Sequence, residues 1–144
     1  MNDTDFAPIV IGKLLNIGGM LEKKANQLLA PFNLNQQQFS LLFEIDLAGK
    51  VNQKAIVNRL VLEKAHVSKI IKKLSGLDLI NVAVSPEDRR ATWVTITPKG
   101  RALVCQCREV IDGFNQRWMA IANNTKLKET LDVLTELQRA FREI

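Results

Sequence analysis

Apolar residues recur with helical spacing in the first third of the chain and predict two helices. The first runs from Pro8 to Ala30 and ends at Pro31, which cannot continue a helix. The second follows Asn35, which forms a capping-box pattern with Gln38, and it stops at Gly49. Its apolar stripe consists of Phe39, Leu42, Phe43 and Leu47.

The middle of the chain predicts two short helices followed by a β-hairpin. Asn52 can cap a third helix that ends at Leu60, and a connector of residues 61–63 leads into a fourth helix from Lys64. This pair has the length and spacing of a helix-turn-helix. Segments 79–84 and 92–97 are rich in β-branched residues, and a turn of residues 85–91 separates them, so they should pair as a hairpin.

Two more helices are predicted after the hairpin. Thr97 can cap a long helix that has Pro98 at its first position and runs to about Ala122. Asn123 and Asn124 break the pattern, and a final helix follows. Its stripe, together with those of the first and fifth helices, exceeds what one small core needs, which indicates a dimer. The stripe consists of Leu127, Leu131, Leu134, Leu137 and Phe141.

The fourth helix has one apolar side and one cationic side. At 100° per residue, with His66 at zero, the apolar arc spans about 40° to 140° and should face inward; it holds Val67, Ile70, Ile71 and Leu74. The opposite arc holds Ala65, His66, Lys69, Lys72 and Lys73. Such a face can fit a major groove. The alternative for an isolated helix of this kind is a solvated charged surface.

The residue types on this face suggest that some residues contact bases and others contact the DNA backbone. Short or planar groups near the helix start suit base edges, so Ala65, His66, Ser68 and Lys69 are expected to approach bases, and Ala65 can touch a thymine methyl group. Lys72 and Lys73 are flexible point charges and should lie mainly on the DNA backbone. If it does not contact DNA, His66 is expected to be an ordinary surface histidine and not a metal ligand or a catalytic base. No second ligand or nucleophile lies near it in the sequence.

The turn of the hairpin places two arginines at its tip. In the run from Ser85 to Arg90, Pro86 stiffens the turn, and the neighbouring acids can fold back to orient Arg89 and Arg90. A narrow minor groove attracts such arginines through its enhanced negative potential. The alternative is a solvated turn with local ion pairs.

Charge is concentrated where these elements lie. Residues 51–101 hold ten Lys and Arg against four acids, a net charge of +6, whereas the rest of the chain holds ten against eleven. A net charge of +5 and a pI near 9.4 favour a polyanionic partner, and the clustering favours nucleic acid.

Other classes of protein fit the sequence less well. One His, no Tyr, no glycine-rich phosphate loop and no metal-ligand spacing disfavour an enzyme, and no cofactor or metal is expected. We expect no export signal and no membrane span, and therefore a cytoplasmic protein. Cys105 and Cys107 should be reduced thiols on opposite sides of one helix that mainly fill space, with redox sensing as a minor hypothesis.

The wing region resembles a known family. The order of elements and six residues in and after the hairpin resemble the wing signature of the MarR family of winged-helix transcription regulators. The resemblance covers nearly the whole chain. The six residues are Asp88, Arg90, Val94, Ile96, Thr97 and Gly100. Two positions depart from the family pattern: Asp78 stands where glycine is usual, and Val82 stands where an arginine is common.

The resemblance implies a mainly α (α+β) fold, a winged helix-turn-helix with six helices and a β-hairpin wing. Residues 35–97 would form the DNA-binding region, and residues 1–34 and 98–144 would form the helical dimerisation region. The family also implies Arg90 in the minor groove, Asp88 holding that arginine, and Arg89 on phosphate. First-helix cysteines, through which some relatives sense oxidants, are absent.

The function expected from these features is that of a sequence-specific transcriptional regulator. It would be a homodimeric repressor on a pseudo-palindromic operator, released from double-stranded DNA by a small amphipathic or aromatic effector. The alternative is a winged-helix protein-interaction module, whose basic face meets an acidic protein partner.

Overall fold

The computed structural model describes residues 1–122 and 126–144, and its first helix, α1 (Asp3–Leu29), begins earlier than the predicted Pro8. The reason is a capping box: the Asn2 side chain accepts the Asp5 N–H at 3.3 Å, and the Asp5 carboxylate accepts the Asn2 N–H at 2.9 Å. A short 3-10 helix, η1 (Ala30–Phe32), follows. Pro31 therefore ends the α-helix as predicted.

Three helices form the helix-turn-helix region. They are α2 (Gln36–Ala48), α3 (Gln53–Leu60) and α4 (Lys64–Gly76). The predicted capping box of α2 is confirmed, and Asn52 caps α3 by accepting the Ala55 N–H at 2.8 Å. Val61, between α3 and α4, has a φ of 53°, in the left-handed region that β-branched residues avoid.

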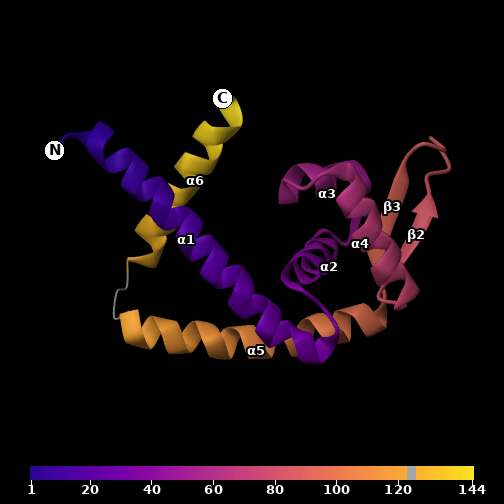
Figure 1. Ribbon diagram of the computed structural model, residues 1–144. Coiled ribbons are helices and arrows are strands. Elements are labelled where there is room, and N and C mark those ends of the chain that lie inside the picture. Colours follow the sequence, from indigo (N-terminus) through magenta and orange to yellow (C-terminus); the bar gives the residue numbers. More distant parts are fainter. Residues whose placement is uncertain (123–125) are drawn as a thin grey trace. The chain divides into compact units, whose positions relative to one another are not determined.

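A small antiparallel sheet lies beside these helices. The predicted hairpin is confirmed as β2 (Ile80–Val84) and β3 (Thr92–Ile96), and the sheet order is β1-β3-β2. The third strand, β1 (Lys50–Asn52), was not predicted because it is too short to show a period. Figure 1 shows α4 alongside the hairpin, and α4 contacts β2.

Helix α5 (Pro98–Ala122) starts against the base of the hairpin. Thr97 caps it as predicted, because its hydroxyl accepts the Gly100 N–H at 3.0 Å. That hydroxyl also donates to the Asp78 carbonyl oxygen at 2.7 Å, and the Thr97 N–H donates to the Leu79 carbonyl oxygen at 3.0 Å. The start of α5 is therefore bound to the segment that joins α4 to β2.

The last helix is α6 (Leu127–Glu143), close to its predicted range. The break predicted at Asn123 and Asn124 lies outside the described residues. The chain divides into two compact units, Met1–Ile111 and Asp112–Ile144. No helix of the described ranges is long and apolar enough to cross a membrane.

The hydrophobic core lies in the first unit, where α2, α3, α4 and the sheet meet. All of the buried apolar residues described lie before Asp112. They are Leu29, Leu34, Leu41, Leu42, Ile45, Val51, Ile56, Val67, Ile70, Ile71, Leu74, Leu79, Ile80, Val94, Val104 and Cys107. By contrast, α1 exposes many large apolar side chains before Ala25, and so does α6 along its length.

Candidate nucleic-acid interface

Helix α4 presents the two faces that its sequence predicts. Val67, Ile70, Ile71 and Leu74 are buried, which confirms the inward arc. The predicted DNA-contact residues of this helix are all exposed on the other side. They are Ala65, His66, Ser68, Lys69, Lys72 and Lys73. Burial of the apolar arc fixes the rotation of the helix, so the cationic face is directed to solvent.

Three of these exposed residues also contact neighbouring helices. His66 Nε2 lies 2.5 Å from Gln37 Oε1 of α2, and the Gln53 amide of α3 donates to Ser68 Oγ at 2.5 Å. Lys73 Nζ donates to the Gln38 side-chain oxygen of α2 at 3.3 Å. These contacts join elements that are far apart in the sequence, so periodicity gave no signal for them.

The tip of the wing is held by the Ser85 side chain and by backbone hydrogen bonds. Ser85 is buried, and its hydroxyl accepts the N–H groups of Glu87 and Asp88 at 3.3 and 3.4 Å. The Ser85 N–H donates to the Ala91 carbonyl oxygen at 2.9 Å, and the Ala91 N–H donates to that of Asp88 at 3.0 Å. The tip is therefore an ordered turn.

Asp88 contacts Arg90 through the backbone. Its carboxylate accepts the Arg90 N–H at 2.9 Å, an Asx-type turn that sets the direction of the chain at the arginine. Within the described ranges, no carboxylate lies within 4.0 Å of the guanidinium of Arg89 or Arg90. Both arginines are exposed, so their guanidinium groups are accessible to an external partner. Their roles on DNA stay predictions.

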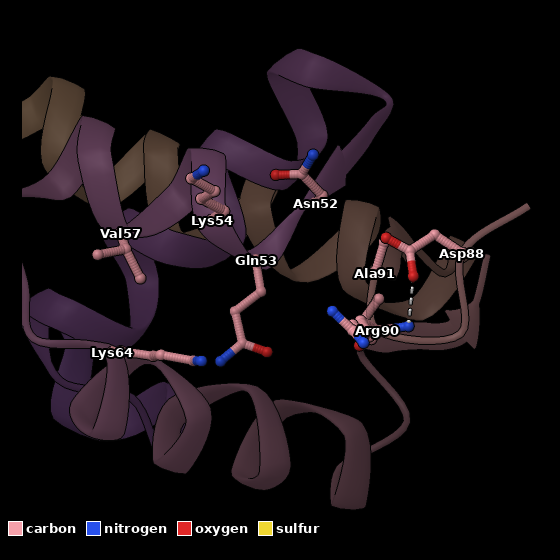
Figure 2. Close-up of a pocket in the computed structure, with 9 residues that line it drawn as sticks. Asn52, Gln53, Lys54, Val57, Lys64, Asp88, Arg90 and Ala91 are labelled. Atoms are coloured by element: carbon pink, nitrogen blue, oxygen red, sulfur yellow. Dashed lines mark hydrogen bonds between the residues drawn. The ribbon is translucent and has the colours of Figure 1, made fainter.

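A hollow of about 460 Å³ brings the wing and the helix-turn-helix together. It is lined by Gln53 and Lys54 of α3, by Lys64 in the first turn of α4, and by Asp88 and Arg90 of the wing, among others. Figure 2 shows Lys64 and Gln53 extending toward each other, with Arg90 on the wing side of the same space. The start of α4 and the wing tip therefore border one surface.

A second hollow, of about 500 Å³, lies between α4 and β2. Lys69 and Lys72 line it together with Val82, one of the two residues that depart from the family pattern. An apolar side chain thus stands beside two ammonium groups, where an arginine would add a third cation. The hollow continues the cationic face of α4 toward the strand.

Several residues of this surface were not predicted as contacts. Lys54 and Lys64 are cations beside the wing, and the position of Lys64 in the first turn of α4 is a signal that could have identified it. Gln37, Gln38 and Gln53 are neutral residues on other helices. Spacing marks Gln38 only as the capping-box partner of Asn35, and it gives no signal of a contact with α4 for any of the three.

The two cysteines differ in environment, as their spacing predicts. Cys107 is fully buried and burial raises its pKa from 9.0 to about 11, so its thiol stays protonated at neutral pH. Cys105 is exposed, so the expectation that it fills space is wrong. No cluster of three or more His, Cys, Asp or Glu suited to a metal occurs within the described residues.

A helix-turn-helix, an adjacent two-stranded wing and a cationic face between them define the winged-helix class of DNA-binding regulators. The model of the MarR family matches residues 34–92. An uncharacterized HTH-type transcriptional regulator of Staphylococcus aureus strain MSSA476 is 30% identical over 120 residues, covering 81% of this chain and 82% of the relative. The chain belongs to the MarR family, whose members are transcriptional regulators and not enzymes.

Solved structures share the fold over almost the whole chain. The transcriptional regulator BldR from Sulfolobus solfataricus has a TM-score of 0.89 at 22% identity, covering 97% of this chain and 99% of that one. MarR of Staphylococcus aureus in complex with salicylate and kanamycin has a TM-score of 0.84 at 24% identity, with 96% and 93% covered. A mutant Escherichia coli MarR complexed with operator DNA has a TM-score of 0.77 at 19% identity, with 94% and 97% covered.

Proposed function

We propose that this chain is a sequence-specific repressor that binds a pseudo-palindromic operator as a homodimer. The observation that carries the proposal is the shared hollow beside Lys64 and Arg90, which puts the recognition helix and the wing tip on one surface. One duplex can then receive α4 in its major groove and Arg90 in the adjacent minor groove. The complex of a fold relative with operator DNA supports this use of the fold.

The contact residues divide by chemistry. Ala65, His66, Ser68 and Lys69 lie toward the start of α4 and would meet base edges, whereas Lys72 and Lys73 would meet phosphates. In the wing, Arg90 would enter the minor groove and Arg89 would contact phosphate. Asp88 would orient Arg90 through the 2.9 Å contact to its N–H.

Exposed apolar side chains support the homodimer. Residues 1–34 and 98–144 would form the dimerisation region, and residues 35–97 the DNA-binding region. On α1, Leu15 and Met20 are 73% and 66% exposed, and on α6, Leu131 is 62% exposed. Such surfaces are costly in water and are typical of chains that bury them against a second copy. Two copies would place two recognition helices about one helical turn of DNA apart.

The repressor would respond to a small amphipathic or aromatic molecule that binds between the two regions. A fold relative is known in complex with salicylate and kanamycin, which supports a ligand of this class. Binding that favours a spacing of the recognition helices unsuited to adjacent major grooves would release the DNA.

The test is selection of bound sequences from random DNA, followed by titration of the selected operator with variants. Arg90→Ala should weaken operator binding about tenfold, because a minor-groove contact is lost. Lys72→Ala should weaken operator and random DNA alike and flatten the salt slope by about one unit. Lys128→Ala, which removes the same charge from α6, is the control and should change neither.

Two outcomes would contradict the proposal. Unchanged operator affinity for Arg90→Ala would remove the wing from the interface. Binding without sequence preference or salt dependence, together with a co-purifying acidic protein, would instead favour the protein-interaction module.

A further inference from the structure

Glutamine side chains hold the exposed face of α4 along one flank. His66 Nε2 lies 2.5 Å from Gln37 Oε1, and because an amide oxygen only accepts, Nε2 carries the hydrogen. Seven residues further along α4, about two turns, Lys73 Nζ donates to Gln38 Oε1 at 3.3 Å. His66 and Lys73 lie within about 20° of each other around the helix. This flank is therefore bound to the first turn of α2.

A third glutamine holds the opposite flank. Gln53 of α3 donates its amide hydrogen to Ser68 Oγ at 2.5 Å. Ser68 lies about 160° around the helix from His66. Because one lone pair of the Ser68 hydroxyl is occupied by Gln53, the O–H hydrogen is left to donate to another group.

The side chains between these two flanks are not bonded to neighbouring helices within the described residues. Ala65, Lys69 and Lys72 lie at intermediate angles, and none of them forms a side-chain hydrogen bond or ion pair within the part of the chain that the structure describes. All three line the hollow beside β2. On the exposed face of α4, the side chains of the two flanks are therefore hydrogen-bonded to other helices, and those of the middle stripe are not.

The three glutamines that bond to α4 are uncharged, which suits a surface that binds an anion. A carboxylate in place of Gln37 or Gln38 would bind His66 or Lys73 more strongly, but it would cancel positive charge and repel phosphate. An amide fixes the side chain and leaves the cationic potential of the face intact. Within the described ranges, no ion pair engages a lysine of α4.

We propose that Gln37 and Gln53 are positioning residues for DNA recognition, acting through His66 and Ser68. Gln37 fixes the ring of His66, and Gln53 sets Ser68 as a hydrogen-bond donor toward an acceptor on the DNA. Both side chains are then ordered before DNA binds, so less rotamer entropy is lost in the specific complex. The inference rests on the proposed function, because it concerns how the same surface discriminates sequences.

The experiment uses the full chain and the operator selected with wild-type protein. Gln37→Met and Gln53→Met keep the length of the side chain and remove its hydrogen-bonding groups. The matched control is Gln36→Met, because the Gln36 side chain donates to Ser40 of its own helix at 2.8 Å and forms no hydrogen bond to α4 within the described residues. Operator affinity, random-DNA affinity, base preference and thermal unfolding are measured for each variant.

We expect Gln37→Met and Gln53→Met to weaken operator binding about three- to tenfold, the loss typical of one hydrogen bond. Random-DNA affinity should change less than about twofold, because no charge is removed. Base preference should relax at the positions read by His66 or Ser68, with an unfolding temperature like that of Gln36→Met. Adding Gln37→Met to His66→Ala should cause no further loss.

Three results would overturn the inference. In the first, both glutamine variants bind the operator with wild-type affinity. In the second, their affinity falls equally for operator and random DNA. In the third, the loss of affinity from Gln37→Met adds fully to that from His66→Ala in the double variant. These are distinct from failure of the proposed function, in which the wild-type protein itself selects no sequence. A variant that fails to fold is detected by its unfolding curve, and the other glutamine then decides the result.

Discussion

Replacing Gly100 with alanine should destabilise the first unit by forcing α5 away from the base of the hairpin. A Cβ atom at this position would lie 2.2 Å from the Leu79 carbonyl oxygen and 2.8 Å from Ile96 Cγ1. The carbonyl belongs to the backbone at the start of the hairpin, so it cannot move aside as a flexible side chain would. The two segments must separate by about 1 Å to restore van der Waals contact.

The cost can be worked from the contacts at this junction. Separation weakens the hydrogen bonds from Thr97 to the carbonyl oxygens of Leu79 and Asp78, at 3.0 and 2.7 Å, each worth about 1 kcal/mol. Overpacking adds about 1–3 kcal/mol, and the better helix propensity of alanine returns about 1 kcal/mol. The net loss is about 2–4 kcal/mol, or an unfolding temperature lower by about 6–13 °C.

Differential scanning calorimetry of Gly100→Ala and Gly113→Ala checks this reasoning. Gly113 lies in the same helix, and a Cβ added there meets nothing within 4 Å, so its substitution should raise stability by about 0.5–1 kcal/mol. Equal unfolding temperatures for the two variants would refute the argument from close approach.

Three further predictions concern strain, ionisation and assembly. Val61→Asn should raise the unfolding temperature by about 2–3 °C, because Val61 is 73% exposed and its φ of 53° suits asparagine better; an unchanged value would mean that the backbone there is unstrained. Burial raises the pKa of Cys107 to about 11, so stability present below pH 9 should fall by up to about 2–3 kcal/mol between pH 9 and 11, and denaturant titrations should show less of this fall in Cys107→Ala. Leu131→Glu with Leu134→Glu should yield monomers in light scattering, whereas Val133→Glu, on the other side of α6, should not; a dimer in both would exclude α6 from the interface.

The sequence predicted those parts of the fold that depend on local patterns. Asn35, Asn52 and Thr97 were identified as caps because their side chains bond to backbone groups three residues away. The inward arc of α4 followed from its 3.6-residue period, and the hairpin followed from β-branched runs around a polar turn. Each of these signals lies within a few residues of the structure that it determines.

Features that depend on contacts between distant segments could not be predicted. Strand β1 exists because Val51 pairs with Val94, and three residues carry no period of their own. The contact of Gln37 with His66 joins residues from two helices that only the folded core brings together. Asp88 was expected to hold an arginine, but the choice between its backbone and its guanidinium depends on the geometry of the turn.

Asn52 belongs to two elements at once, because it lies opposite Trp93 in the sheet and accepts the Ala55 N–H at the start of α3. The wing and the helix-turn-helix are therefore joined without an intervening linker. Variation confined to residues 86–90 can alter the reach of the loop while the strands keep their orientation. Under the proposed function, substitutions confined to that loop would change DNA preference without altering the helices.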